Sequence, residues 1–261
     1  MFTKNYFYLI RIQYLGYRFH GWQKQPNLKT VQFMIERTLK FVLGEQKFKI
    51  LASGRTDAMV SANDAAIELF LKDQPLHDLD DFLQLFNQNL PQDIRALSIK
   101  EVDESFNIIQ HSKSKEYYYL FAHGDKFHPF CAPILCTILD KLDIDAMKKG
   151  ATLFQGTHNF KSYCYKASDN GTYKRAIDHC EIVENNEISA SFFPKKTYLL
   201  KVKGKGFGRN QIRLMMGTLI KLGKGEIDLK FISDSLLPES EQHMDYIAPA
   251  SGLILNSLEF D

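Results

Sequence analysis

The order in which apolar patterns follow one another in the first part of the chain most restricts its possible folds. Alternating apolar residues predict strands, and apolar residues three or four apart predict helices. Thr30 is placed to cap the first helix and Gly44 to end it. The predicted elements are a strand Tyr6–Tyr14, a helix Val31–Val42, strands Lys47–Ala52 and Ala65–Leu71, a helix Leu79–Phe86 and a strand Ile94–Val102.

This order of strand, helix, strand, strand, helix, strand is that of the split βαβ, or ferredoxin-like, unit. The second half has a looser version of it. Its predicted elements are a strand Tyr117–Ala122, a helix Ile144–Phe154, strands Ala176–Val183, Ile188–Phe192 and Tyr198–Val202, helices Gln211–Leu222 and Leu229–Leu236, and a strand Leu253–Phe260.

We therefore expect an α+β fold, in which two ferredoxin-like (split βαβ) units share a central, mostly antiparallel sheet with helices packed on it. The expected domains are 1–112 and 113–261, with the connection near Gln110–Ser114 as the boundary. Because no repeat is visible in the sequence itself, this duplication rests on element order alone.

Composition limits the class of protein. With 261 residues, 44% of them hydrophobic, and a net charge of +2, the chain can bury a large core and has no overall basic excess. The N-terminus has no pattern of a signal peptide or membrane span, and the four cysteines form no C-x-x-C pair. These features predict a soluble, cytoplasmic protein with reduced thiols. The cysteine and histidine spacings match no common zinc module, so no metal is expected.

The stretch Gly54-Arg55-Thr56-Asp57 follows directly on a predicted strand. Gly54 permits unusual backbone angles or the close approach of a ligand, and the polar residues after it fall in a loop expected to reach Asn63. On these residues alone a structural turn is the commoner explanation, because Gly and Asp dominate turns. A functional site is the alternative.

Basic residues concentrate between Lys195 and Lys224, where no Asp or Glu occurs. Such a run is either a phosphate-binding surface or an ordinary solvated face. Arg213 lies within it among apolar residues of a predicted helix, so its guanidinium should be partly buried and should need a carboxylate partner. Asp57 is the best candidate for that partner.

Two aromatic positions also have alternative explanations. Tyr117 and Tyr119 share one face of a predicted strand, where one of them could stack on a base or both could belong to the core. Trp22, the single tryptophan, lies in the polar loop Gly21–Gln25 and needs either a packing partner or an RNA contact.

Taken together, these segments resemble the TruA-type tRNA pseudouridine synthase family, and the resemblance covers nearly the whole chain. The matching segments, in family order, are Tyr14 with Gly21-Trp22-Gln23-x-Gln25, Gly54-Arg55-Thr56-Asp57-Ala58, Asn87-x-x-Leu90-Pro91-x-Asp93-Ile94, Lys115-x-Tyr117-x-Tyr119, Gly156-Thr157-His158-Asn159-Phe160, Arg213 with Gly217-Thr218-Leu219, and Ala248-Pro249-Ala250-x-Gly252-Leu253.

The resemblance implies an enzyme that detaches the uracil of a uridine in tRNA, turns it and rejoins it through carbon 5, without metal or cofactor. By resemblance Asp57 is the catalytic carboxylate, as nucleophile or as base, and Arg213 pairs with it. Tyr117 stacks on the uracil and assists proton removal from carbon 5. Arg55 takes the place of the flipped nucleotide.

Further expectations concern binding and assembly. The expected RNA-binding residues are Arg55, Trp22, Lys203, Lys205 and Arg209. The resemblance also implies tRNA as the partner, uridines in the anticodon stem-loop (tRNA positions 38 to 40) as targets, and a homodimer that holds the tRNA across both subunits.

Three segments depart from the family pattern. Gly-Val-His-Ala is replaced by Met59-Val60-Ser61-Ala62, and Phe-His-Ala-Arg by Phe106-Asn107-Ile108-Ile109. Arg209 and Asn210 stand where an aromatic residue and a histidine are usual.

The alternative functions are therefore a catalytically silent RNA-binding paralogue and a synthase acting at other RNA positions. A third is a glycoside or nucleoside hydrolase, which would need Asp64 or Glu68 as a second carboxylate beside Asp57.

Overall fold

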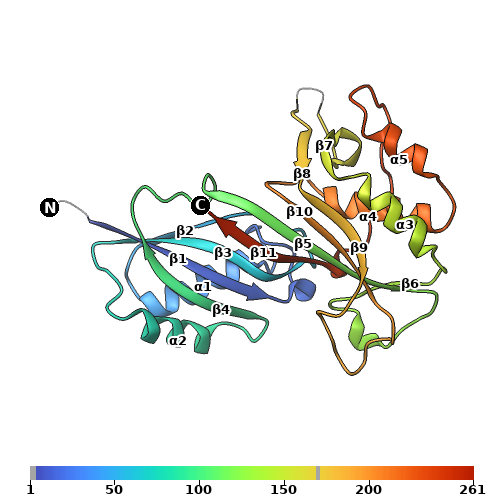
Figure 1. Cartoon of the computed structure of the whole chain (residues 1–261). Helices are drawn as coiled ribbons and strands as arrows, with labels where there is room; N and C mark the ends of the chain where they lie inside the picture. Colours follow the sequence, from blue (N-terminus) through green and yellow to red (C-terminus); the bar gives the residue numbers. More distant parts are fainter. Residues whose placement is uncertain (1–3, 169–170) are drawn as a thin grey trace. The chain divides into compact units, whose positions relative to one another are not determined.

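The computed structural model describes residues 4–168 and 171–261, which form two compact units (Figure 1). The first unit takes the chain up to Lys113 together with Leu255–Asp261, and the second is Ser114–Ile254. The predicted α+β class, with mostly antiparallel sheet and helices packed on it, is confirmed.

The first unit has the predicted split βαβ order. Its elements are β1 (Asn5–Tyr14), α1 (Val31–Leu43), β2 (Phe48–Ala52), β3 (Ser61–Lys72), α2 (Leu79–Asn89) and β4 (Ile94–Val102). The sheet runs β4-β1-β3, β2 pairs with the end of β3, and all these pairs are antiparallel. β11 (Leu253–Phe260) follows β3 in the strand order.

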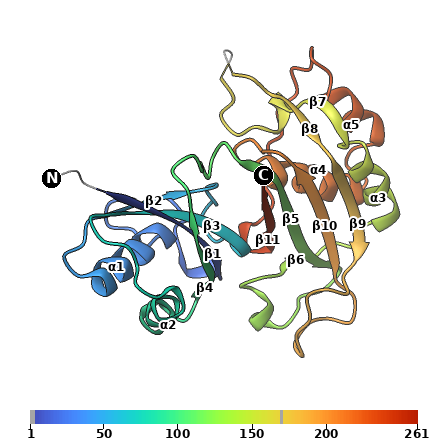
Figure 2. The ribbon, with the colours of Figure 1, turned by 60° about the vertical axis from the view of Figure 1, so that its left-hand side comes forward.

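Both faces of this sheet are covered. Tyr8, Ile10 and Ile12 alternate along β1 and are fully buried, while Leu9 points to the opposite face, where it packs with Leu258 of β11. The helices α1 and α2 lie together on one side of the strands (Figure 2). Residues therefore pack on both faces of the sheet, and the loops that join its strands lie at the strand ends.

The second unit is built from the elements between β4 and β11. Their bounds are β5 Ser112–His123, β6 Cys136–Ile138, α3 Ile144–Thr152, β7 Gly156–Asn159, β8 Lys174–Ile177, β9 His179–Glu184, β10 Tyr198–Gly204, α4 Gln211–Gly223 and α5 Leu229–Ser235. The main sheet has the antiparallel order β5-β10-β9. The short β6 runs parallel to β5, and β7 and β8 form a separate two-stranded sheet. The helices α3, α4 and α5 lie beside these strands in both ribbon views (Figures 1 and 2).

Some predicted elements were wrong in extent or type. β3 begins at Ser61, so the loop after β2 is shorter than expected. The strand expected at Ala176–Val183 is divided at Asp178 into β8 and β9, and β6 and β7 were not predicted. Residues 188–192 form no strand. There the Asn185 side chain accepts the Ile188 N–H at 3.0 Å and donates to the Ile188 carbonyl at 2.7 Å, which occupies the groups that a ladder would need.

In the described part of the chain no helix is long and apolar enough to cross a membrane. Within the same residues, no group of three or more His, Cys, Asp and Glu side chains could hold a metal ion.

Candidate active site

Asp57 lies in the short loop that joins β2 to β3. Its side chain is partly buried, while that of Arg55 is exposed. The Val60 N–H donates to the Asp57 carbonyl at 3.2 Å, and the Met59 N–H donates to the Phe19 carbonyl at 3.1 Å. Met59 has a φ of 67°, in the left-handed region, where the loop turns back toward β3. The backbone around Asp57 is thus held by defined bonds at its C-terminal side.

A second loop, residues 21–25, supports the N-terminal side of Asp57. The Trp22 N–H donates to the Thr56 carbonyl at 3.0 Å, and the Tyr14 hydroxyl lies 2.8 Å from the Thr56 hydroxyl. Gly21 has a φ of 86°, and a Cβ there would lie 2.9 Å from the Thr56 carbonyl oxygen. Only glycine combines that backbone angle with so close an approach. The two loops therefore pack backbone to backbone directly beside Asp57.

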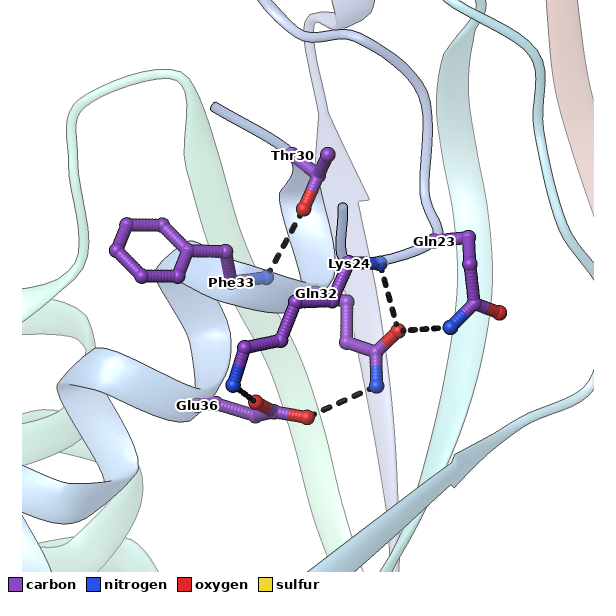
Figure 3. Close-up of polar contacts among 6 residues, drawn as sticks. All are labelled: Gln23, Lys24, Thr30, Gln32, Phe33 and Glu36. Atoms are coloured by element: carbon purple, nitrogen blue, oxygen red, sulfur yellow. Dashed lines mark hydrogen bonds and ion pairs between the residues drawn. The ribbon is translucent and has the colours of Figure 1, made fainter. Parts of the chain in front are cut away.

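The supporting loop is in turn attached to the first turns of α1 (Figure 3). The Gln32 amide oxygen accepts from the Lys24 N–H at 3.1 Å and from the Gln23 side chain at 3.2 Å. Gln32 donates to Glu36 at 2.8 Å, and Lys24 forms an ion pair with the other oxygen of Glu36 at 2.7 Å. Thr30 caps the helix. Side chains one turn apart on α1 thus fix the loop that holds Thr56.

Trp22 is almost fully buried within the first unit. Its side chain is only 4% exposed, and its ring packs against Tyr14 with the centroids 6.2 Å apart. Tyr14 is therefore the packing partner that the sequence left open, and an RNA contact of Trp22 stays a prediction. Trp22 supports the Asp57 loop from inside the first unit.

Tyr117 lies on β5 in the second unit and is partly buried. Its ring meets Phe207 edge to face at 5.3 Å. Tyr119 on the same face is fully buried, and its hydroxyl donates to the Pro249 carbonyl at 2.7 Å. Of these two tyrosines, Tyr119 belongs to the core, whereas Tyr117 is only partly buried.

Arg213 lies in the first turn of α4 and is partly buried, as its apolar neighbours suggested. Its Nε donates to the Ala248 carbonyl at 2.7 Å, and the Ala248 N–H donates back to the Arg213 carbonyl at 3.1 Å. Nη1 lies 3.4 Å from the Asn210 amide oxygen, and Asn210 itself has a left-handed φ of 57°. The plane of the guanidinium is therefore set by backbone and by the residue that starts the helix.

The basic residues that were expected to bind RNA differ in their exposure. Lys205 and Arg209 are exposed, and Lys203 on β10 is partly buried. The Arg209 guanidinium lies 5.2 Å from the ring of Tyr165, and the Tyr165 N–H donates to the Arg209 carbonyl at 3.0 Å. Tyr165 was not predicted as a site residue. An aromatic residue between basic ones, as in Lys161 to Lys166, is the signal that could have found it.

Lys115 is a second residue that sequence reasoning left without a role. It lies opposite Gly204 in the β5–β10 ladder, two residues before Tyr117 on the same face. Burial lowers the pKa of the Lys115 ammonium.

The predicted site residues fall into two groups. Asp57, Arg55 and Trp22 belong to the first unit. Tyr117, Lys203, Lys205, Arg209 and Arg213 belong to the second.

Comparison with known proteins adds an independent line of evidence. The family model described as tRNA pseudouridine synthase matches residues 10–109 and 151–261. A protein of Bacillus cereus named tRNA pseudouridine synthase A 2 is 31% identical over 256 residues, covering 97% of this chain and 99% of the relative. A tRNA pseudouridine synthase A of Dictyoglomus thermophilum is 29% identical, covering 96% and 98%, and one of a Bacillus species is 32% identical, covering 97% and 99%.

Proposed function

Since this chain belongs to the tRNA pseudouridine synthase family, we propose that it isomerises uridine to pseudouridine in the anticodon stem-loop of tRNA, at tRNA positions 38 to 40. Membership of the family by itself indicates an isomerase that acts on a uridine of tRNA. The observation that carries our assignment of the chemistry is the Asp57 loop, which backbone bonds hold on both sides of the carboxylate.

Asp57 is the proposed catalytic group. The reaction breaks the bond from ribose carbon 1′ to uracil N1 and forms a bond from carbon 1′ to carbon 5. Carbon 5 loses a proton and N1 gains one, so the reaction needs no outside reagent. An ionised carboxylate serves either as the nucleophile that holds the ribose or base, or as the base that starts the elimination. A loop held on both sides suits either role, because the carboxylate need not be ordered again for each turnover.

Arg213 is the proposed partner of Asp57 when the two units act together. Its guanidinium carries several donors in a fixed plane, and the Ala248 carbonyl already determines how that plane is turned. A bidentate partner would orient the Asp57 carboxylate and balance its charge. This pairing is the main geometrical requirement of the proposal.

The remaining site residues have roles in binding the substrate. The partly exposed ring of Tyr117 is suited to stack on the uracil, and its hydroxyl to assist removal of the carbon 5 proton. Arg55 is exposed on the same loop as Asp57 and would fill the space left when the target nucleotide leaves its stack. Lys203, Lys205 and Arg209 would contact phosphates.

The first test is replacement of Asp57. We expect Asp57→Asn and Asp57→Ala to abolish pseudouridine formation while tRNA binding persists. Chemical mapping of pseudouridine on total tRNA incubated with each variant measures both activity and position. Asp73→Asn is the matched control, because Asp73 is exposed and has a left-handed φ that asparagine also adopts. Normal product from either Asp57 variant would overturn the assignment.

The second test concerns Arg213. Lysine keeps the charge but lacks the planar fork, so Arg213→Lys should slow single-turnover product formation on the order of 10- to 1,000-fold. Thermal unfolding of the same variant separates this effect from a loss of fold. A rate within a factor of two of wild type would show that the fork does not position Asp57.

The alternatives are distinguished by the same mapping experiment. A catalytically silent paralogue, suggested by the three departures from the family pattern, would bind tRNA and leave every uridine unchanged. A synthase with other targets would give pseudouridine outside the anticodon arm. Cytoplasmic localisation and a homodimer that places the tRNA across both subunits complete the proposal. Light scattering of the protein with and without tRNA tests the assembly.

A further inference from the structure

An open pocket of about 690 Å³ lies in the first unit, away from the catalytic loop, where α1 ends and β2 begins. Its lining combines exposed ammonium groups with aromatic rings. The lysines and aromatic residues of the lining are Lys40, Lys47, Lys49, Lys72, Phe48 and Phe70.

The pocket carries an excess of positive charge. Four lysines line it, and Glu45 is the single acidic residue in the lining. Among the described residues, none of these four lysines takes part in an ion pair. Elsewhere on the chain exposed lysines do find carboxylates, as Lys24 does with Glu36 at 2.7 Å. Lys49 acts electrostatically on the buried Glu68 carboxyl, and the positive charge of the other pocket lysines is available to an outside anion.

Part of the pocket wall is aromatic. Lys49 and Phe70 are direct partners in the β2–β3 ladder, and the Lys49 ammonium lies 5.8 Å from the centre of the Phe70 ring. Phe7 meets Phe70 edge to face at 5.5 Å, which fixes the plane of that ring. A planar base can stack on such a ring while a neighbouring ammonium contacts its phosphate.

The backbone of the rim is held in place. The Lys72 N–H donates to the Lys47 carbonyl at 3.3 Å. The Gln46 side chain donates to the Lys72 carbonyl at 3.2 Å and to the Gln74 carbonyl at 2.6 Å. These bonds join the start of β2 to the end of β3, so the lysines project from a preformed surface.

We propose that this lysine pocket is a second RNA-binding site, which holds a nucleotide of the tRNA substrate with its phosphates on the lysines and its base against Phe70. The inference rests on the proposed function. β2 leads from the pocket to the loop that carries Asp57, and its five residues span about 16 Å. An RNA strand that enters the catalytic loop can therefore follow β2 back to the pocket, and each further phosphate bound there strengthens binding without reading sequence.

The test compares two sets of lysine-to-alanine changes that remove the same charge. The pocket variant is Lys40→Ala, Lys47→Ala, Lys49→Ala and Lys72→Ala. The control variant changes exposed lysines of the second unit, namely Lys126, Lys141, Lys148 and Lys149. Filter binding of full-length tRNA is measured for both over a range of salt concentrations, and thermal unfolding confirms that both are folded.

We expect the pocket variant to bind tRNA about tenfold more weakly or worse at physiological salt, and the control to stay within a factor of two of wild type. The slope of log affinity against log salt should fall by about 0.7 to 0.9 for each phosphate contact removed. A conservative variant, with arginine at the four pocket positions, should restore both values. Equal affinity and equal slope for the pocket and control variants would overturn the proposal.

These experiments distinguish an error in the pocket proposal from an error in the proposed function. If wild-type protein binds tRNA but makes no pseudouridine, the function is wrong and the binding comparison still tests the pocket. If wild-type protein makes pseudouridine and the pocket variant binds like the control, the function stands and the pocket proposal is wrong. A second readout is the tRNA concentration that gives half the maximal rate, which should rise in the pocket variant by the same factor as the dissociation constant.

Discussion

At the scale of single residues, two carboxylates on β3 have structural roles that bear on the alternative functions. Glu68 is 1% exposed, and its Oε2 accepts the Ile108 N–H at 3.1 Å. Asp64 forms an ion pair with Arg11 at 3.1 Å. A hydrolase would need one of these beside Asp57 as a second catalytic carboxylate. Both are engaged within the first unit, so neither supports that alternative.

The burial of Glu68 also makes the stability of the folded protein depend on pH. Burial raises the pKa of Glu68, although the Ile108 N–H, His111 and Lys49 act in the other direction. A carboxyl whose folded pKa lies above its unfolded value favours the neutral form. The folded state therefore gains stability as pH falls through the folded pKa toward the unfolded value, and loses it as pH rises.

We expect Glu68→Gln to stabilise the protein at pH 8, because glutamine keeps the oxygen that accepts from Ile108 and carries no charge. The gain should shrink toward pH 5. Urea denaturation of both proteins at the two pH values measures the difference in free energy of unfolding. Glu104→Gln, at an exposed position, is the control and should show no such trend. A destabilised Glu68→Gln at pH 8 would mean that the charge is compensated.

At the scale of elements, the loop from Gly21 to Gln25 connects α1 to the Asp57 loop. A comparison of Gly21 with Gly44 distinguishes the effect of backbone strain from the effect of the contact with Thr56. Gly21 and Gly44 both have positive φ, 86° and 61°. A Cβ at Gly21 would lie 2.9 Å from the Thr56 carbonyl oxygen, whereas a Cβ at Gly44 would meet nothing within 4 Å.

Both Gly21→Ala and Gly44→Ala should cost at least about 1–2 kcal/mol of stability, since each places alanine at a positive φ that residues with a side chain rarely adopt. Only Gly21→Ala should also reduce turnover, by on the order of tenfold or more, because it displaces Thr56 next to Asp57. Thermal unfolding and single-turnover kinetics of the two variants check this. Equal activity of both would mean that the loop contact does not position the carboxylate.

The elements that could be predicted from sequence are those determined by nearby residues. Thr30 and Gly44 flank an amphipathic stretch, and α1 begins and ends beside them. β3 was predicted too short because its first residues are polar. Tertiary contacts make them a strand: Ala62 pairs with Tyr14, and the Ser61 hydroxyl accepts the Gly16 N–H at 2.9 Å.

For the candidate site too, the sequence indicates what nearby residues determine and does not report contacts between distant segments. The glycine and the place after a strand drew attention to Asp57 but on their own favoured a structural turn, and its expected catalytic role came from the need of Arg213 for a carboxylate and from the family resemblance. The support that Gly21 and Trp22 give to Thr56 joins segments far apart in the chain, and no periodicity reports such a contact. The lysine pocket was missed for a similar reason, because Lys40 comes from a helix and Lys72 from the end of a strand that folding brings to it.

At the scale of the whole molecule, the division of the chain does not follow its linear order. Residues Leu255–Asp261 belong to the first unit, although they follow the entire second unit in sequence. In the first unit Leu258 packs with Leu9, Ala66 and Ile108, and its carbonyl accepts from Arg11 at 2.7 Å. We propose that the chain folds as two units that divide near residue 112, as expected, and that the last segment, Leu255–Asp261, folds with the first unit.

A pair of fragments tests that proposal. Residues 1–113 alone should be less stable than the same fragment with residues 253–261 joined by a flexible linker. Burial of a leucine contributes about 1.5–3 kcal/mol, so the difference in free energy of unfolding should be at least of that size. Urea denaturation measures it, and a linked segment with Leu258→Ala is the control. Equal stability of all three fragments would show that β11 adds nothing to the first unit.

The late return of β11 has a consequence for how the protein is made. Residues 255–261 are translated after the entire second unit, so the first unit must wait through the translation of the second without its last strand. During that time the first half of β3 presents unpaired backbone groups, and an open strand edge invites pairing with other nascent chains. β11 thus completes the first unit last in time, and chains whose translation stops before residue 255 should be the aggregation-prone form of this protein.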